Sequence, residues 1–279
     1  MIQSRPGLRV RVLTIALAIV TCCICVPNTA AEEDRFPGWH DAPFPDGPVG
    51  EAIAFGQRIL AHTPENVPAY SGNTLNCTSC HLDGGRTPWA APWVGVWGVF
   101  PEYRSRNAKV NALQDRINDC FERSLNGRTL PLASQEMIGI LAYMQWLSRE
   151  VPTGKSVSGR GFLRIKSTQI PDPVRGARVY VQKCALCHGD AGQGTVTATG
   201  DTIYPPLWGP KSFNIGAGMA RLNTAAAFVK ANMPLGQGGS LTDQEAFDVA
   251  VFFTRQPRPD FTGKLEDWPT GGKPDDARY

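Results

Sequence analysis

The sequence predicts an all-α fold of two similar small domains, and three observations lead to this prediction. Segments with the apolar spacing of packed helices recur in both halves of the chain in matching order. Segments with the alternating pattern of a strand are close to absent. The length of 279 residues gives room for about two domains, and 42% apolar residues are enough to bury their cores.

The N-terminal segment has the features of a cleaved secretory signal peptide, which we expect to cover residues 1–31. A basic region precedes the apolar run Val12–Val20, which is too short to span a membrane. Thr29 and Ala31 are the small residues of a cleavage site that leaves Glu32 first. The sequence thus predicts export to the periplasm. A lipid anchor on a cysteine after the apolar run is the weaker alternative, because the small residues that such processing requires do not precede it.

The charge of the remaining chain is balanced. Three of the 28 basic residues and none of the 25 acidic residues lie within 1–31, so the rest of the chain carries no net charge. This balance gives no reason to expect nucleic acid or an anionic membrane as a partner.

Five cysteines lie outside the signal segment, an odd number that argues against a disulfide framework. Four of them form the motifs Cys77-Thr-Ser-Cys80-His81 and Cys184-Ala-Leu-Cys187-His188. The pattern C-x-x-C-H is the attachment signature of c-type haem, in which both thiols bond to one haem and the histidine binds its iron. We therefore expect two covalently bound haem c groups, one in each of two class I cytochrome c-like domains. The two other histidines, His40 and His62, are expected on the surface.

An internal duplication accompanies the two motifs, which lie 107 residues apart. A similar short helical segment precedes each motif, at Gly56–Leu60 and Gly176–Tyr180. A longer one follows each, at Ser134–Leu147 and Asp243–Phe253, with their Gln-Glu pairs 109 residues apart. Thr242 with Glu245 forms a capping box before the last of these helices.

Composition predicts the boundaries between the parts of the chain. The segment between the duplicated halves is rich in Gly, Ser, Lys and Pro and is expected to be a linker, and the Pro- and charge-rich C-terminal tail is expected to be extended or loose. The predicted parts are the signal peptide 1–31, the first domain 32–151, the linker 152–173, the second domain 174–258 and the tail 259–279.

Two loops are expected to pack around the haems. Trp89, Trp93 and Trp97 follow the first motif and are interpreted as packing in its haem crevice. In the second domain, the carbonyl of Pro206 is a candidate to accept the Nδ1 proton of His188.

The distal ligand of the second haem is predicted to be Met233. It precedes a proline in a loop before the last helix, and a thioether ligand raises the potential of a haem that passes electrons on. Met219, in a Gly-rich loop, is the rival candidate, and Lys230 and Asn232 are weaker ones.

The distal ligand of the first haem is predicted to be Cys120, 39 residues after His81. The alternative is that Cys120 is a small buried apolar residue. Met137 and Met144 lie in the packed helix, where methionine ordinarily fills the core.

Arginines surround Cys120 in the sequence. Apolar spacing at Val110, Leu113, Ile117 and Phe121 predicts a helix, on which Arg116 lies about 40° from Cys120. If the helix extends far enough, Arg106 lies about 40° away on the other side, and Ser124 is one turn beyond. Such arginines either form a solvated face, partly neutralised by nearby acids, or bind an anion beside the thiolate.

At these residues the sequence resembles a known family, the dihaem thiosulfate dehydrogenases. The resemblance rests on Arg116-Ile-Asn-Asp-Cys-Phe-Glu-Arg-Ser-Leu-Asn-Gly-Arg128 and on Asn76-Cys-Thr-Ser-Cys-His-Leu-Asp-Gly-Gly-Arg86. It implies an active-site haem held by His81 and Cys120, and an electron-transfer haem at His188. It also implies that Arg106, Arg116 and Ser124 line an anion site. Some members carry lysine before the distal methionine, where this chain has Asn232, so Met233 is the simpler ligand here.

The sequence therefore predicts a periplasmic dihaem enzyme that oxidises two thiosulfate ions to tetrathionate and passes two electrons to a soluble cytochrome c or a similar acceptor. Two alternatives stay open. One is a Sox-type dihaem subunit that loads sulfur onto a carrier protein. The other is a plain dihaem electron carrier in which Cys120 is structural. A peroxidase is a weaker reading, because no histidine is left in a plausible distal position.

Overall fold

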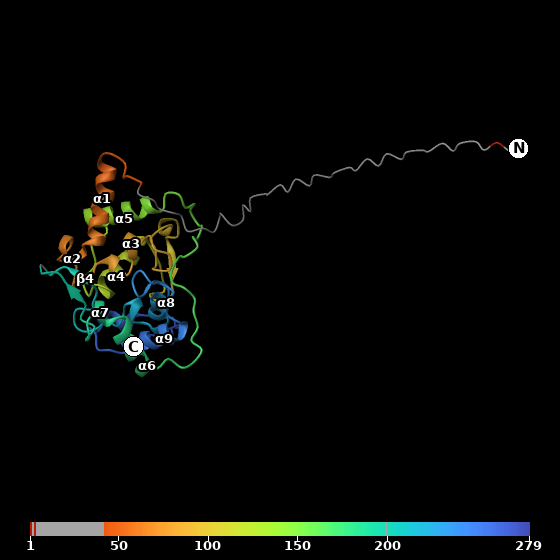
Figure 1. Ribbon diagram of the computed structural model, residues 1–279. Helices are drawn as coiled ribbons and strands as arrows, with labels where there is room; N and C mark the ends of the chain where they lie inside the picture. The colour runs from red at the N-terminus through yellow and green to blue at the C-terminus, as the bar shows by residue number, and fades with distance from the viewer. Residues whose placement is uncertain (2, 4–41, 199) are drawn as a thin grey trace. The chain divides into compact units, whose positions relative to one another are not determined.

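The computed structural model describes residues 1, 3, 42–198 and 200–279 (Figure 1). The predicted signal peptide lies outside these residues except for Met1 and Gln3, as do the expected first residue Glu32 and His40. None of the helices in the described part is both long enough and apolar enough to cross a membrane.

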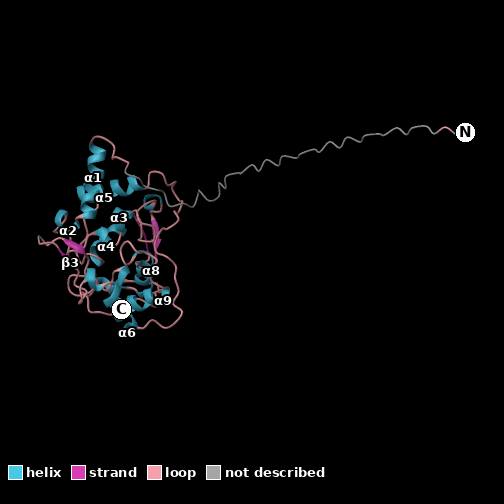
Figure 2. Cartoon of the chain, viewed as in Figure 1, coloured by secondary structure: helices cyan, strands magenta, loops and turns pink. Residues whose placement is uncertain are grey.

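The prediction of a mostly helical fold is confirmed (Figure 2). The longer helices are α1 (Pro48–Ala61), α4 (Leu113–Arg123), α5 (Gln135–Leu147), α6 (Pro173–Lys183), α8 (Leu222–Asn232) and α9 (Asp243–Thr254). The shorter ones are α2 (Thr63–Asn66), η2 (Cys77–Ser79), α3 (Leu82–Gly85), η3 (Val96–Gly98), α7 (Ala185–His188), η4 (Gly218–Ala220) and η5 (Thr262–Glu266). In Figure 1, α1 to α5 lie together above α6 to α9.

The same helix crossing occurs in both halves. Helix α1 packs on α5 where Gly56 meets Gly139, so closely that a Cβ atom on Gly56 would lie 1.9 Å from the Gly139 carbonyl oxygen. Helix α6 packs on α9 in the same way, and a Cβ on Gly176 would lie 1.9 Å from the Asp248 carbonyl oxygen. Because each crossing joins the helix before a Cys-x-x-Cys-His motif to the helix after it, the structure repeats the predicted duplication.

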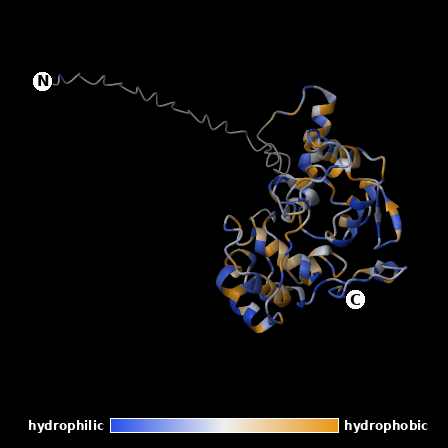
Figure 3. Ribbon diagram, turned by 90° about the vertical axis from the view of Figure 1, so that its right-hand side faces the viewer, coloured by the Kyte–Doolittle hydropathy of each residue, from blue (hydrophilic) through white to orange (hydrophobic). Residues whose placement is uncertain are grey.

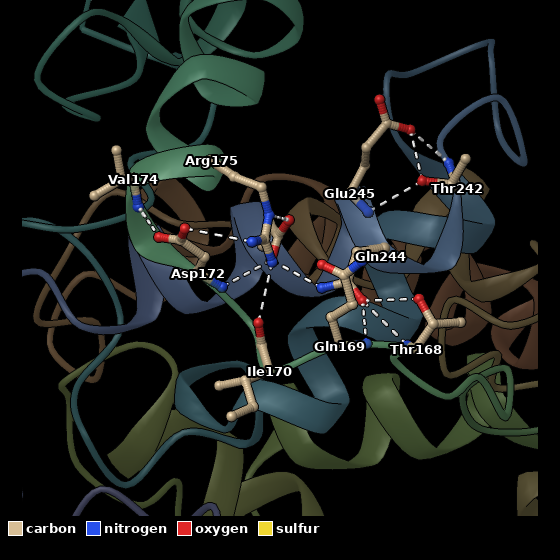
Figure 4. Close-up of polar contacts among 10 residues, drawn as sticks. Thr168, Gln169, Ile170, Asp172, Val174, Arg175, Thr242, Gln244 and Glu245 are labelled. Carbon is tan, nitrogen blue, oxygen red and sulfur yellow. Dashed lines mark hydrogen bonds and ion pairs between the residues drawn. The ribbon is translucent and has the colours of Figure 1, made fainter.

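Polar contacts lock the second crossing (Figure 4). The buried carboxylate of Asp248 accepts hydrogen bonds from Nε of Arg175 at 2.6 Å and from the backbone of Asp172 at 2.7 Å. The predicted capping box of α9 is present, since the Thr242 backbone donates to the Glu245 carboxylate at 2.8 Å and the Glu245 backbone donates back at 3.1 Å. The contacts of Asp248 fix the start of α6 against α9, and the capping box fixes where α9 begins.

Two apolar clusters form the cores. The first contains α1, α4 and α5 side chains such as Ile59, Phe121 and Ile140, and the second contains α6, α8 and α9 side chains. Figure 3 shows the helices carrying both hydrophobic and hydrophilic residues, as amphipathic helices that face a core do. Phe213 and Ala217 come from the second half but pack in the first cluster, so the two halves share an apolar interface.

A β-hairpin replaces the first part of the helix expected around Cys120. Strand β1 (Glu102–Arg104) pairs antiparallel with β2 (Lys109–Asn111), and Val110, expected on an apolar helix face, is 67% exposed. Helix α4 begins only at Leu113, because the carboxylate of Asp115 accepts the backbone hydrogen of Ala112 at 2.8 Å and caps it there. A second small ladder joins β3 (Thr195–Val196) to β4 (Thr202–Tyr204).

The C-terminal tail is packed, and the expectation of a loose tail is wrong for the described residues. Phe261 and Trp268 are each 8% exposed. The carboxylate of Asp267 accepts hydrogen bonds from two guanidinium groups, at 2.8 Å from Nε of Arg106 and at 2.8 and 2.9 Å from Arg123. These ion pairs tie the tail to the hairpin and to α4.

The connecting segment between α5 and α6 is also tied down. The backbone of Trp89 donates to the Gly159 carbonyl at 2.7 Å, and that of Ala91 donates to the Gly161 carbonyl at 2.9 Å. The backbone of Gly154 donates to the Gly98 carbonyl at 3.0 Å. The first part of this segment therefore lies along the loops of the first domain, although the predicted domain boundaries themselves remain a prediction.

Candidate functional site

A cavity of about 390 Å³ in the first half gathers the predicted haem-binding residues. Cys77, Cys80, His81 and Cys120 all line it, together with apolar side chains from α1, α4 and α5. None of these cysteines forms a disulfide. Two thiols, an imidazole and a further sulfur around one apolar cavity are the donor set that a covalently attached haem requires.

The loop that follows the first motif orients His81. Nδ1 of His81 lies 2.6 Å from the Ala91 carbonyl oxygen, and its ring lies against buried Trp93 with centroids 4.8 Å apart. Burial, and to a lesser degree the charge of Arg116, lowers the pKa of His81 to about 4. The imidazole is therefore neutral near pH 7, and when Nδ1 donates to Ala91 the lone pair of Nε2 is left to bind a metal.

Burial also affects the attachment thiols, raising the pKa of Cys77 and of Cys80 to about 12. Both thiols are therefore protonated near pH 7.

Arg116 contacts the sulfur of Cys120. Both residues lie on α4 one turn apart, and Nη1 of Arg116 lies 2.9 Å from Sγ of Cys120. The electrostatic interaction with Cys120 raises the pKa of Arg116 above its usual value. Ser124, at the end of the same helix, also lines the cavity. The structure thus brings Cys120, Arg116 and Ser124 together, as the sequence predicted.

Arg106 does not join them. It lies in the turn between β1 and β2, not on α4, so the helical relation to Cys120 expected from the sequence does not exist. Its guanidinium is held by Asp267 and Tyr279 and lies over the ring of Trp268, 4.9 Å from the centroid. It is not among the residues that line the cavity.

Two other arginines that the sequence analysis did not single out do line the cavity, namely Arg104 and Arg160. Arg104 belongs to the arginine-rich stretch before Cys120, which was the available signal. Arg160 lies in the connecting segment, and nothing local in its sequence indicates a place in the first domain.

The second cavity, of about 270 Å³, repeats the arrangement. Cys184, Cys187 and His188 line it. Nδ1 of His188 lies 2.8 Å from the carbonyl oxygen of Pro205. The predicted acceptor, Pro206, is one residue too far along, and its carbonyl accepts instead from Oγ of Ser212 at 3.1 Å. Burial lowers the pKa of His188, which favours the neutral imidazole here too.

Both candidate methionines, Met219 and Met233, line the second cavity. The weaker candidates point elsewhere. Nζ of Lys230 donates to the carbonyls of Gly239 and Leu241, and buried Asn232 donates to the Phe228 carbonyl at 3.1 Å and to the Trp89 carbonyl at 3.3 Å. Of the four candidate ligands named from the sequence, the two methionines line this cavity, and the choice of Met233 stays a prediction.

The two cavities share a wall. The residues that line both are Leu75, Asn76, Cys80, Phe213 and Met219. Because these residues line both spaces, the two cavities are neighbours.

Two cavities, each lined by a Cys-x-x-Cys-His motif and a further sulfur side chain, define a dihaem c-type cytochrome. Comparison with family models agrees: residues 69–153 match the SoxA/TsdA cytochrome c domain, and residues 171–253 match subunit III of cbb3-type cytochrome c oxidase.

The chain is similar to several curated proteins named thiosulfate dehydrogenase. It is 47% identical to that of Psychrobacter arcticus over 85% of this chain and 73% of the relative, and 50% identical to that of Allochromatium vinosum over 78% and 82%. A solved thiosulfate dehydrogenase, TsdBA from Marichromatium purpuratum, matches 82% of this chain at 39% identity with a TM-score of 0.79. This chain spans about half the length of that solved chain. The protein belongs to the thiosulfate dehydrogenase family, which favours the predicted dehydrogenase over the Sox-type subunit.

Proposed function

We propose that the protein oxidises two thiosulfate ions to one tetrathionate ion in the periplasm and passes the two electrons to an external acceptor. The observation that carries the proposal is the contact between Nη1 of Arg116 and Sγ of Cys120 inside a cavity built to hold a haem. A haem-binding thiolate paired with a guanidinium offers both a reactive sulfur and a charge that attracts an anion.

His81 with Cys77 and Cys80, and His188 with Cys184 and Cys187, hold the two haem groups in this proposal. Cys120 and Met233 supply the second ligands. When bound, the haems supply acceptors for two electrons. All other steps belong to the side chains of the first cavity.

Cys120 forms the first new bond. Its thiolate joins the outer sulfur of one thiosulfate in an S–S bond, and two electrons leave the pair of sulfurs. The second thiosulfate attacks that outer sulfur, as in thiol–disulfide exchange, and the Cys120 thiolate leaves again. The sum is two thiosulfate ions converted into one tetrathionate ion and two electrons, with Cys120 restored.

Arg116 provides the charge that lets two dianions meet. Two charges of −2 at about 5 Å repel by roughly 3 kcal/mol at the dielectric constant of water and by roughly 13 kcal/mol at an effective value of 20. Arg116 lies at the reacting sulfur, and Ser124 adds a hydroxyl to the same cavity. The role predicted for Arg106 stays a prediction; its guanidinium is held by Asp267, and it is not among the residues that line the cavity.

The electrons leave through the second domain. Apolar side chains are exposed there, including Leu186 between the two attachment cysteines, which is 96% exposed. Ile203 and Leu235 line the second cavity and are 52% and 61% exposed. An exposed apolar rim around a redox site suits brief contact with a small electron-carrying protein, and a soluble cytochrome c is the acceptor we propose.

The test uses the haem-loaded protein with thiosulfate and ferricyanide, following both ferricyanide reduction and tetrathionate formation. We expect two ferricyanide ions reduced for each tetrathionate formed. Cys120→Ala is expected to abolish the reaction while both haems remain attached, and Met144→Leu, a core change in the same cavity, is expected to retain it. Near-normal turnover by Cys120→Ala would contradict the mechanism. Absence of tetrathionate from the wild-type protein, with thiolate ligation intact, would favour a sulfur-loading subunit instead.

A further inference from the structure

Three guanidinium groups line the first cavity, and the proposed reaction uses one of them. Arg116 is held at the sulfur of Cys120, whereas Arg104 and Arg160 have no part in that step. The residues that line the cavity include no aspartate or glutamate. Arg104 and Arg160 are therefore two cationic side chains of the cavity that the reacting sulfur does not explain.

Arg160 is fixed to the loop that orients His81. The carbonyls on either side of it, at Gly159 and Gly161, accept hydrogen bonds from the backbones of Trp89 and Ala91 at 2.7 and 2.9 Å. The carbonyl of Ala91 in turn lies 2.6 Å from Nδ1 of His81. The connecting segment thus brings Arg160 to the cavity from the side of the histidine ligand.

Arg104 comes from the element that leads to Cys120. It ends strand β1, whose partner β2 runs directly into α4. Between the two arginines lies Glu102, whose carboxylate is 3.0 Å from Arg104 and 3.8 Å from Arg160. One arginine from the histidine side and one from the cysteine side therefore meet at a single carboxylate.

We propose that Arg104 and Arg160 bind the two propionate groups of the haem in the first cavity. Attachment at Cys77 and Cys80 uses the two vinyl groups of a haem and leaves its two carboxylates to be neutralised. Carboxylates in a largely apolar cavity are costly unless they are paired, and a guanidinium group pairs strongly with a carboxylate. Each guanidinium has five donors, so it serves a propionate and Glu102 together.

The position of Arg160 argues against thiosulfate as the anion that this pair binds. Thiosulfate reacts at the sulfur of Cys120, whereas Arg160 is anchored to the loop of His81. The inference rests on haem c in the first cavity and not on thiosulfate oxidation, so the two are tested separately.

The test measures the reduction potentials of both haems in the intact protein without thiosulfate. Arg160→Gln removes a positive charge beside the haem and is expected to lower the reduction equilibrium constant of the thiolate-ligated haem about threefold, which at 59 mV for each tenfold change is about 28 mV. Glu102→Gln removes a negative charge and is expected to raise the potential instead. The haem of the second domain is expected to keep its potential in both variants.

Arg164→Gln is the matched control, because Arg164 lies in the same segment, is exposed and lines neither cavity. Opposite shifts in Arg160→Gln and Glu102→Gln, absent in Arg164→Gln, would support the proposal, since a folding defect does not change sign. A shift in Arg160→Gln no larger than that of the control would overturn it. So would a raised KM for thiosulfate with an unchanged potential, which would assign the pair to the substrate.

Discussion

Asp267 joins the C-terminal tail to the first domain. The substitution Asp267→Asn tests how much this residue contributes to the free energy that holds the tail in place. The carboxylate is 2% exposed and contacts the guanidinium groups of Arg106 and Arg123, which are 22% and 10% exposed. Arg123 binds both carboxylate oxygens, at 2.8 and 2.9 Å, and the Tyr279 hydroxyl adds a further hydrogen bond. Asparagine keeps the size of the side chain but removes the counter-charge of Arg106, and it leaves Arg123 only the longer ion pair with Asp119 at 3.7 Å.

The size of the expected loss of stability follows from how deeply the arginine partners of Asp267 are buried. Removing one member of a buried ion pair costs 3–5 kcal/mol, because the remaining charge is left unpaired. Arg106 is exposed enough to regain water, so we expect the lower end, about 3 kcal/mol. At about 1.4 kcal/mol for each tenfold change, this corresponds to roughly 100-fold more frequent opening of the tail.

Hydrogen exchange of the haem-loaded protein measures that opening. We expect faster exchange in residues 261–279 and in the hairpin 102–111, since the backbone of Trp268 donates to the Arg106 carbonyl at 2.6 Å. Asp260→Asn is the control, because the Asp260 side chain is 63% exposed and its ion pair with Lys264 is local, while asparagine keeps the oxygen that accepts the backbone hydrogen of Phe261, so the loss of the charge is expected to have no measurable effect. Equal exchange of the tail in the wild-type protein and Asp267→Asn would refute the reasoning.

Three further predictions concern packing, ligation and pH. Gly176→Ala is expected to destabilise the second domain by about 3 kcal/mol in chemical denaturation, because its Cβ would lie 1.9 Å from a carbonyl oxygen of α9, whereas Gly218→Ala meets nothing within 4 Å and is expected to be tolerated. Met233→Ala is expected to change the ligation spectrum of the second haem while Met219→Ala leaves it intact, and the reverse result would identify Met219 as the ligand. Burial by itself raises the pKa of Asp267, but hydrogen bonds from the two arginines and from Tyr279 outweigh it and hold the pKa below the usual value. Its contribution to the free energy of unfolding is therefore full above the carboxyl pKa of the unfolded chain and lost as the pH falls through the folded pKa, and Asp267→Asn should remove this part of the acid sensitivity in denaturation curves measured between about pH 6 and 2.

The sequence predicted the features that depend on local spacing. The Cys-x-x-Cys-His motifs identify both haem sites, because the two attachment cysteines and the histidine ligand lie within five consecutive residues. Apolar periodicity predicted α5 and α9, and the spacing of Arg116 and Cys120 predicted their contact, since residues four apart on a helix are neighbours. These features need no knowledge of the rest of the chain.

Features that depend on distant contacts were not predictable in the same way. Arg106 is held by a carboxylate 161 residues away, and Phe213 packs in the core of the other half of the chain. The helix expected to reach back to Arg106 begins instead at Leu113, where the carboxylate of Asp115 caps its N-terminus. The apolar spacing continues back to Val110, so the sequence pattern alone placed the start of the helix too early. Arg160 reaches the first cavity only because backbone contacts fix the connecting segment to the loops near His81.

The shared wall between the cavities changes what the connecting segment has to do. Two cytochrome domains joined by a loose linker exchange electrons only as often as the domains meet. Here Leu75, Asn76, Cys80, Phe213 and Met219 line both cavities, so the two candidate haem sites are neighbours. The contacts of the connecting segment are instead with the first cavity. Gly159 and Gly161 accept hydrogen bonds from the loop that orients His81, and Arg160 adds a charged side chain to the lining. Changes in this segment should therefore alter the first haem far more than electron transfer between the two.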